Sequence, residues 1–174
     1  GVNLHIGIGV ETITQENGSF RSVTLDCGTV LAGDMLVVGI GVAPDSRLAY
    51  QASVETEHTN GGAILVDGSF RTSNPDIFAI GDVALQRGKS IRIESVHNAQ
   101  DSGARAAASI MGKTQPQKQA PWFWSDQYDI NLQSVGIVPT NVSDIYQVSR
   151  KGRRKLGESF WTYRGEQLLA VEAI

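Results

Sequence analysis

The sequence predicts an α/β chain that ends in an antiparallel, strand-rich segment. Two short apolar runs, residues 64–66 and 77–80, are typical of buried strands. An alanine-rich stretch from about His97 to Met111 predicts a helix, and Gly112 follows it as a C-terminal stop. After residue 120, candidate strands follow one another with turn signals between them. Strand–helix alternation followed by strands alone indicates an α/β part joined to a small antiparallel sheet.

The first fifty or so residues predict a meander of short antiparallel strands. Clusters rich in Asn, Asp and Gly separate three strand-like runs, residues 2–10, 20–25 and 29–31. The continuous apolar run Met35–Val38 then predicts a strand buried on both faces. A short helix is expected from about Ser46.

The last third of the chain follows a polar linker, Lys113–Gln119. Five strands are predicted there, at residues 122–128, 130–137, 144–150, 158–164 and 167–174. They predict an antiparallel sheet.

Composition and charge narrow the class of protein. Of 174 residues, 41% are hydrophobic and 19% are charged, which is typical of a folded globular chain. The net charge of -3 argues against a nucleic-acid partner. Cys27 is the only cysteine, so an internal disulfide, a CxxC pair and a thiolate metal cluster are all excluded. We expect no metal site, and a reducing, cytoplasmic location.

No membrane or targeting segment is expected. The longest apolar stretch, Met35–Ala43, is far shorter than the roughly 20 residues of a membrane span, and the first residues carry no basic leader. Both ends lie inside strand-like runs, whereas natural termini are more often polar. We therefore expect an excerpt of a longer protein.

Two Gly-x-Gly pairs invite a dinucleotide interpretation. The first, Gly7 and Gly9, lacks a third glycine and a following helix, which favours a bend in a strand. The second, Gly39 and Gly41, follows a predicted buried strand, but Pro44 stands where a fingerprint has its last glycine. A structural turn and a close approach of ligand to backbone both remain open there.

The string from Thr72 to Asp82 is more specific. An apolar run ends in Gly81-Asp82, which places a carboxylate at the carboxyl edge of a strand, where open α/β sheets bind ligands. A carboxylate at this edge accepts hydrogen bonds from hydroxyl groups. The alternative is that Asp82 only caps a turn.

Four strings carry a family resemblance that covers essentially the whole chain. TSNPDIFAIGDVA resembles the second flavin motif of two-dinucleotide-domain flavoprotein reductases, and VVGIGVAPDSRLA resembles the end of their NAD domain. IRIESVHNAQDSGARAAASIMGK followed by APWFWSDQYDINLQSVG resembles the ferredoxin reductase branch, which includes putidaredoxin, rubredoxin and biphenyl-dioxygenase reductases. The GxGxxG flavin fingerprint and the first NAD motif of that family are absent from this sequence.

The resemblance implies partial dinucleotide domains of the three-layer type. Residues 1–45 would be the C-terminal part of the NAD-binding domain, and residues 46–116 the second segment of the FAD-binding domain. Residues 117–174 would be a truncated C-terminal reductase domain with an antiparallel α+β fold.

The activity implied is that of an FAD-dependent NAD(P)H:ferredoxin oxidoreductase. Electrons would pass from NADH or NADPH through FAD to an iron–sulfur ferredoxin or a rubredoxin, in a dioxygenase or P450 chain. The fragment alone is expected to be inactive. The alternatives are a docking module without flavin, or a relative of nitrite reductases or apoptosis factors. The electron acceptor, the NADH or NADPH preference and the oligomeric state stay open.

The resemblance also implies which residues contact the flavin. Asp82 would bind the ribityl chain, with Val83 at the turn beneath it, and Glu94 and Val96 would lie near the isoalloxazine. The helix start at His97 and Asn98 would direct unpaired N–H groups at the flavin. Trp122 and Trp124 would wall the flavin, and Gly39 and Gly41 would line the NAD side. No catalytic side chain is expected, because hydride transfer belongs to the cofactor.

The same residues have plainer interpretations. His97 would then be an exposed helix-start residue, and both tryptophans would be core residues. The basic run Arg150–Lys155 is either a solvated loop or a surface that steers an acidic ferredoxin.

Overall fold

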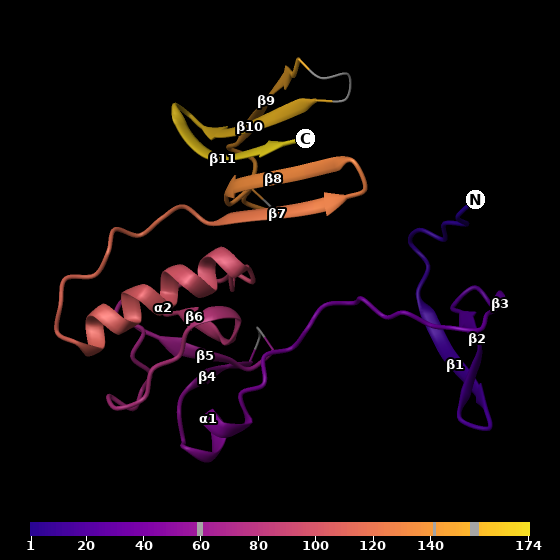
Figure 1. Cartoon of the computed structure of the whole chain (residues 1–174), viewed down its shortest axis with the longest axis horizontal. Helices are drawn as coiled ribbons and strands as arrows, with labels where there is room; N and C mark the ends of the chain where they lie inside the picture. Colours follow the sequence, from indigo (N-terminus) through magenta and orange to yellow (C-terminus); the bar gives the residue numbers. More distant parts are fainter. Residues whose placement is uncertain (59–60, 141, 154–156) are drawn as a thin grey trace. The chain divides into compact units, whose positions relative to one another are not determined.

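The computed structural model describes residues 1–58, 61–140, 142–153 and 157–174. The chain divides into two compact units, Gly1–Val42 and Ala43–Ile174. The first unit holds one sheet, and the second holds two sheets and the long helix (Figure 1). In the described residues, no helix is long and apolar enough to cross a membrane.

The first unit is a three-stranded antiparallel meander, as the sequence predicts. Its strands, in the order in which they pair, are β1 (Val10–Glu16), β2 (Ser19–Leu25) and β3 (Val30–Ala32). Asn17 and Gly18 both have positive φ, 51° and 78°, as a two-residue hairpin turn requires. Val23 and Leu25 of β2 are buried.

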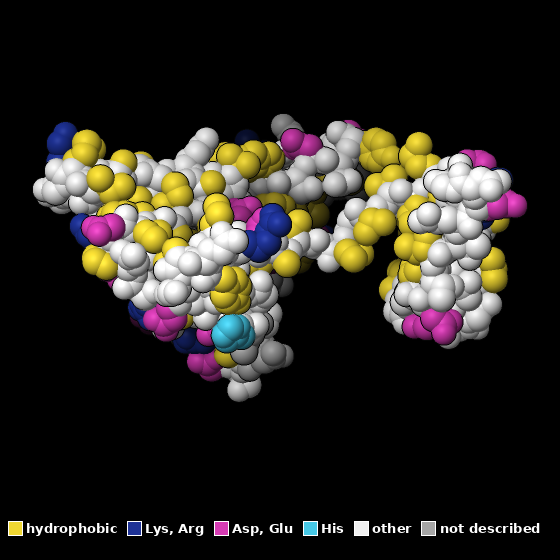
Figure 2. Space-filling model, turned by 90° about the horizontal axis from the view of Figure 1, so that it is seen from below, with side chains coloured by type: hydrophobic (Ala, Val, Ile, Leu, Met, Phe, Trp, Pro, Cys, Tyr) yellow, Lys and Arg dark blue, Asp and Glu magenta, His cyan; other side chains and the backbone are white. Residues whose placement is uncertain are grey.

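Three predicted strands are wrong. Residues 2–9 are irregular and β1 begins only at Val10, while Met35–Val38 form no strand and Met35 is 80% exposed. Figure 2 shows hydrophobic side chains left open along the segment that precedes Ala43. Residues 77–80 form a single bridge, between Phe78 and Arg71. Such runs become strands only when neighbours supply hydrogen bonds along their edges, and in the described residues 77–80 pair only with residues 70–72.

A small mixed sheet opens the second unit. It consists of β4 (Thr56–Glu57), β5 (Ala63–Val66) and β6 (Ala84–Gln86), with β5 antiparallel to β4 and parallel to β6. β5 confirms the predicted run at 64–66, and α1 (Arg47–Gln51) confirms the short helix after Ser46. The predicted elements did not include β4 and β6, which have two and three residues.

Helix α2 (Val96–Ile110) matches its prediction to within one residue at each end. Ser95 caps it by accepting a hydrogen bond from the Asn98 N–H, at 3.1 Å. At the other end Gly112 has φ 64° and donates to the Ser109 carbonyl, while Lys113 donates to the Ala108 carbonyl. This pair of bonds is a Schellman motif, which needs a residue that tolerates positive φ.

Helix α2 packs against strand β5 and the segment that follows this strand. Ala106 of α2 joins Val66, Phe70 and Ala79 in one buried cluster. Val83 also packs against this cluster. The helix is therefore held by apolar contacts with residues on both sides of the predicted 77–80 strand.

The C-terminal sheet is antiparallel throughout and confirms all five predicted strands, with ends shifted by at most two residues. Its strands are β7 (Trp122–Gln127), β8 (Ile130–Gly136), β9 (Tyr146–Lys151), β10 (Glu158–Arg164) and β11 (Gln167–Ala173). They pair in the order β7-β8-β11-β10-β9.

Gly136, at the end of β8, lies against the backbone of β11. A Cβ there would come within 2.1 Å of the Leu169 carbonyl oxygen and 2.8 Å of the Ala170 Cα, and the residue has φ 91°. Only glycine permits this approach.

Candidate functional site

The turn at Gly81–Val83, a short 3-10 helix, is fixed against α2. Gly81 has φ 68°, and its N–H donates to Ser102 Oγ over 3.0 Å in a buried hydrogen bond. A Cβ on Gly81 would contact Ala99 of α2 at 3.6 Å. The turn thus buries Gly81 and leaves the next residue, Asp82, exposed.

Asp82 lies at the edge of a cavity of about 440 Å³, called here the Asp82 cavity. Three segments surround it: the 81–83 turn, the start of α2 and strand β7. Its lining residues are Asp82, Glu94, Ser95, Val96, Ala99, Phe123 and Trp124. Four of the predicted flavin contacts, Asp82, Glu94, Val96 and Trp124, therefore meet in one space.

Arg92 links two walls of this cavity, and the sequence interpretation missed it. Its guanidinium forms an ion pair with Glu94 through Nη2 and donates from Nη1 to the backbone carbonyl of Asp82. The Arg92 side chain is only 11% exposed. Alternate residues of an extended segment share a face, so the Arg-x-Glu spacing was the signal that pointed to this pair.

The start of α2 gives the cavity a positive pole. Val96 and His97, the first two helical residues, have N–H groups with no partner inside the helix, and Val96 lines the cavity. A helix N-terminus carries about half a positive charge. The arrangement suits an electron-rich group at the helix end and hydroxyls at the Asp82 carboxylate.

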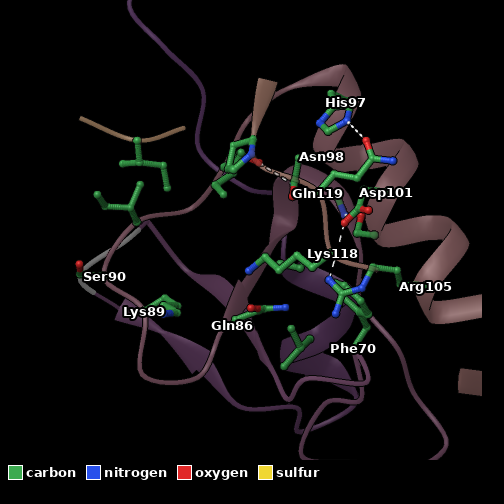
Figure 3. Close-up of a pocket in the computed structure, with 18 residues that line it drawn as sticks. Phe70, Gln86, Lys89, Ser90, His97, Asn98, Asp101, Arg105, Lys118 and Gln119 are labelled. Carbon is green, nitrogen blue, oxygen red and sulfur yellow. Dashed lines mark hydrogen bonds and ion pairs between the residues drawn. The ribbon is translucent and has the colours of Figure 1, made fainter. Parts of the chain in front are cut away.

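His97 and Asn98 lie elsewhere. Both line a second cavity of about 270 Å³, called here the Arg105 cavity (Figure 3). His97 Nε2 is 2.9 Å from Gln119 Oε1, and Asn98 Nδ2 donates to the Ile93 carbonyl over 2.8 Å. Neither residue is among those that line the Asp82 cavity.

The two predicted tryptophans differ in position. Trp124 lines the Asp82 cavity together with Phe123. The Trp122 ring lies 5.0 Å from that of Trp124 and 5.9 Å from the His97 ring, and its Nε1 donates to Gln133 Oε1 over 2.7 Å. Trp122 thus supports Trp124 from outside that cavity.

Gly39 and Gly41 belong to the first unit, whereas the Asp82 cavity belongs to the second. Both lie in an irregular segment, where Gly41 has φ 91° and a Cβ on either glycine would meet no atom within 4 Å. The turn interpretation of Gly41 agrees with that φ. Their predicted contact with NAD stays a prediction.

In the described part of the basic run, two cationic side chains contact residues of strand β10. The Arg150 guanidinium lies 4.9 Å from the centroid of the Trp161 ring, and Lys151 pairs with Glu158 at 3.0 Å. Hydrogen bonds from Ser149 and Lys151 lower the pKa of the Glu158 carboxyl. Arg153 is exposed, while Arg154 and Lys155 lie outside the described residues.

Two family descriptions match the chain. Pyridine nucleotide-disulphide oxidoreductase matches residues 1–103, and the reductase C-terminal domain matches residues 122–174. Rhodocoxin reductase of Rhodococcus erythropolis is 37% identical over 179 residues, covering 100% of this chain and 40% of the relative. The ferredoxin reductase subunit of the 5,5'-dehydrodivanillate O-demethylase of Sphingobium is 38% identical over 143 residues. The match covers 79% of this chain and 34% of the relative.

Solved structures of related reductases also match the chain, and they confirm the α/β fold class with its C-terminal antiparallel sheet. The ferredoxin reductase for the CYP199A2 system of Rhodopseudomonas palustris matches with a TM-score of 0.85 and 35% identity, over 99% of this chain and 42% of that chain. The covalent complex of putidaredoxin reductase with putidaredoxin matches with a TM-score of 0.82 and 31% identity. This match covers 95% of this chain and 40% of that chain. The chain thus spans about 40% of the length of these structures.

Proposed function

Because the chain belongs to the pyridine nucleotide-disulphide oxidoreductase family, we propose that it is the C-terminal part of an FAD-dependent ferredoxin reductase. Electrons pass from NADH or NADPH through FAD to an iron–sulfur ferredoxin or a rubredoxin. The reductase C-terminal match over residues 122–174 favours this branch, and the relatives that match are reductases of ferredoxin or rubredoxin type.

The observation that carries the proposal is the Asp82 cavity. Separate segments bring a carboxylate, a helix N-terminus and an aromatic wall around one space of about 440 Å³. These groups fit the ribityl and isoalloxazine parts of FAD. In the described residues no glycine-rich turn joins a strand to a helix start, so the pyrophosphate has no such site here.

We assign the chain's own residues as follows. Asp82 accepts hydrogen bonds from ribityl hydroxyls, and Arg92 holds both the Asp82 turn and Glu94 in place. The N–H groups at the start of α2 stabilise negative charge at the flavin edge, and Glu94 is available to the nicotinamide amide. Trp124 closes the cavity on the side of the C-terminal sheet. FAD, when bound, accepts the hydride and releases single electrons.

The domain assignment is part of this proposal. Residues 1–45 complete an NAD-binding domain, residues 46–116 complete an FAD-binding domain, and residues 117–174 belong to the C-terminal reductase domain. Gly39 and Gly41 then lie on the NAD side. We also propose a cytoplasmic location, which the single, free cysteine at position 27 supports.

A reconstituted full-length reductase tests the proposal. The purified protein is expected to carry FAD, to lose its flavin absorbance on addition of NADH, and then to reduce an added ferredoxin. A full-length protein that folds but binds no FAD would contradict the proposal and favour a docking module. A protein whose flavin is reduced but reduces neither ferredoxin nor rubredoxin would contradict the assignment of partners.

A further inference from the structure

The Arg105 cavity lies on the opposite side of α2 from the Asp82 cavity. Successive helical residues are offset by about 100°. Val96 and Ala99 therefore share the face that lines the Asp82 cavity, while His97, Asp101 and Arg105 share the opposite face. The flavin proposed above uses none of the side chains on this second face.

The second cavity has an excess of positive charge. Lys89, Lys118 and Arg105 line it, and Asp101 is the one carboxylate in its described lining. Asp101 is already paired with Arg105 Nη1 at 3.6 Å. Figure 3 shows Arg105 and Lys118 reaching into the same space. The lining therefore attracts an anion.

Arg105 is held in place by contacts with its neighbours. The residue is 9% exposed, its Nη2 donates to Gln115 Oε1 over 2.8 Å, and its guanidinium lies 5.1 Å from the Phe70 ring centroid. Its Nε, also a donor, is buried without a hydrogen-bond partner. Buried donors are normally satisfied by protein, water or ligand.

His97 provides a second unsatisfied atom on the same wall. Its Nε2 interacts with Gln119 Oε1, while Nδ1 is buried without a partner. Two residues that each hold an unpartnered buried nitrogen atom, eight positions apart on one helix face, therefore line a single cavity.

The rest of the lining is largely apolar. Val66, Phe70, Ile91, Ile93 and Ile137 contribute aliphatic and aromatic surface. The volume, about 270 Å³, lies at the small end of ligand pockets, which hold about 300–1,000 Å³. A ligand that satisfies both parts of the lining has one negative head and a compact apolar body.

We propose that the Arg105 cavity binds a small monocarboxylate with an apolar body. Its carboxylate pairs with the Lys118 ammonium and the Arg105 guanidinium, and its body packs against Phe70 and Ile93. This site is separate from the flavin site and does not depend on the electron-transfer function proposed above.

Isothermal titration of the full-length reductase with benzoate tests the site. Benzoate combines the two features, whereas benzyl alcohol lacks the charge and acetate lacks the apolar body. Losing the charge-assisted bonds costs about 1.5–3 kcal/mol, so benzyl alcohol is expected to bind about 10- to 100-fold more weakly than benzoate. Acetate is also expected to bind more weakly.

Three variants locate the binding. Arg105→Gln is expected to weaken benzoate binding about 10- to 100-fold. Lys118→Gln, which removes an exposed charge, is expected to weaken it about two- to fivefold. Lys113→Gln, in the same linker but outside the cavity lining, is the matched control and should leave the affinity unchanged. Lys118→Gln keeps the test decisive if Arg105→Gln fails to fold.

Three results would overturn the proposal. One is the absence of benzoate binding, which would mean that the cavity holds only water. The others are a benzoate affinity that Lys118→Gln leaves unchanged and benzoate binding that displaces FAD, since either would place the ligand elsewhere. Equal benzoate affinity in the FAD-free and FAD-bound forms would support a separate site, whether or not the protein reduces ferredoxin.

Discussion

Asp82 is exposed because its neighbour Gly81 is buried. The Gly81 N–H bonds to Ser102, and Arg92 binds the Asp82 carbonyl oxygen, so the backbone on both sides of the carboxylate is fixed. A side chain presented in this way loses little freedom when a ligand binds, which improves the net gain from each hydrogen bond. The preceding run of residues does not need to be a regular strand for this effect.

Asp82→Ala in the full-length reductase is expected to weaken FAD binding about 10- to 100-fold. The reason is the loss of a charge-assisted hydrogen bond, which contributes about 1.5–3 kcal/mol. Equilibrium titration of the apoprotein with FAD measures the change. Asp76→Ala, an exposed carboxylate in the same string, is the control, and equal affinities of the two variants would show that Asp82 is only a turn residue.

At the scale of elements, strand β7 brings an aromatic wall to the start of α2. Trp124 and Phe123 reach the Asp82 cavity from β7, and the edge-to-face contact between Trp122 and His97 joins the strand to the helix. The strand belongs to the C-terminal sheet, so this wall depends on a different sheet from the one that carries the Asp82 turn.

Trp124→Ala is therefore expected to slow electron delivery to ferredoxin more than it slows flavin reduction by NADH. The tryptophan lies on the side of the C-terminal sheet, which the nicotinamide does not need in the proposed arrangement. Stopped-flow rates of the two half-reactions measure the effect in the full-length protein. Tyr128→Ala, at an exposed turn of the same sheet, is the control; equal slowing of both half-reactions by Trp124→Ala contradicts the assignment.

The hairpin of β9 and β10 is expected to lose stability in acid. Bonds from Ser149 and Lys151 lower the pKa of Glu158, so the carboxylate stabilises the folded chain above the ordinary glutamate pKa, about 4.3. This contribution disappears as the pH falls through the lowered pKa. Urea unfolding across this pH range should show a smaller pH dependence for Glu158→Gln than for the parent. Glu166→Gln, in an exposed turn, should match the parent; a Glu158→Gln slope equal to the parent slope would rule out the linkage.

The sequence predicted elements well where the pairing partners lie in the same chain. Turn signals separate the strands β7 to β11, and each finds its neighbours within fifty residues. Residues 77–80 have an equally clear apolar pattern, yet they need parallel neighbours that the described residues lack. The local pattern of apolar residues predicts which residues are buried. Whether they form a strand depends on hydrogen bonds with segments that are distant in the sequence.

The candidate site was predicted in part, for a similar reason. Asp82, Glu94, Val96 and Trp124 line one cavity, while their contact with the flavin stays a prediction. His97 and Asn98 follow Val96 in the sequence but point to the opposite face of α2, and helical geometry alone decides this once the first helical residue is known. Ser102 was missed because its role is a contact between two segments distant in the sequence, whereas the Arg-x-Glu spacing was a signal for Arg92 that the interpretation overlooked.

At the scale of the whole molecule, the described residues include those proposed to bind the ribityl and isoalloxazine parts of the flavin, but no glycine-rich turn for its pyrophosphate. The 174-residue chain by itself is therefore expected not to retain stoichiometric FAD, because adenine and pyrophosphate need a glycine-rich turn at a helix start. Titration of the purified chain with FAD, followed by gel filtration and a visible spectrum, measures retention. Tight, stoichiometric binding to the chain alone would contradict this expectation; the full-length protein is the positive control.

Gly136 has a consequence for how such sequences diverge. Its backbone meets β11 so closely that any side chain would collide with Leu169, and this constraint comes from the sheet and has nothing to do with the cofactor. A gene copy released from selection for electron transfer would be free to change Asp82, but would still keep glycine at position 136 as long as its product folded. Among distant descendants, this glycine is therefore a marker of ancestry, whereas Asp82, in its proposed role, is a marker of retained chemistry.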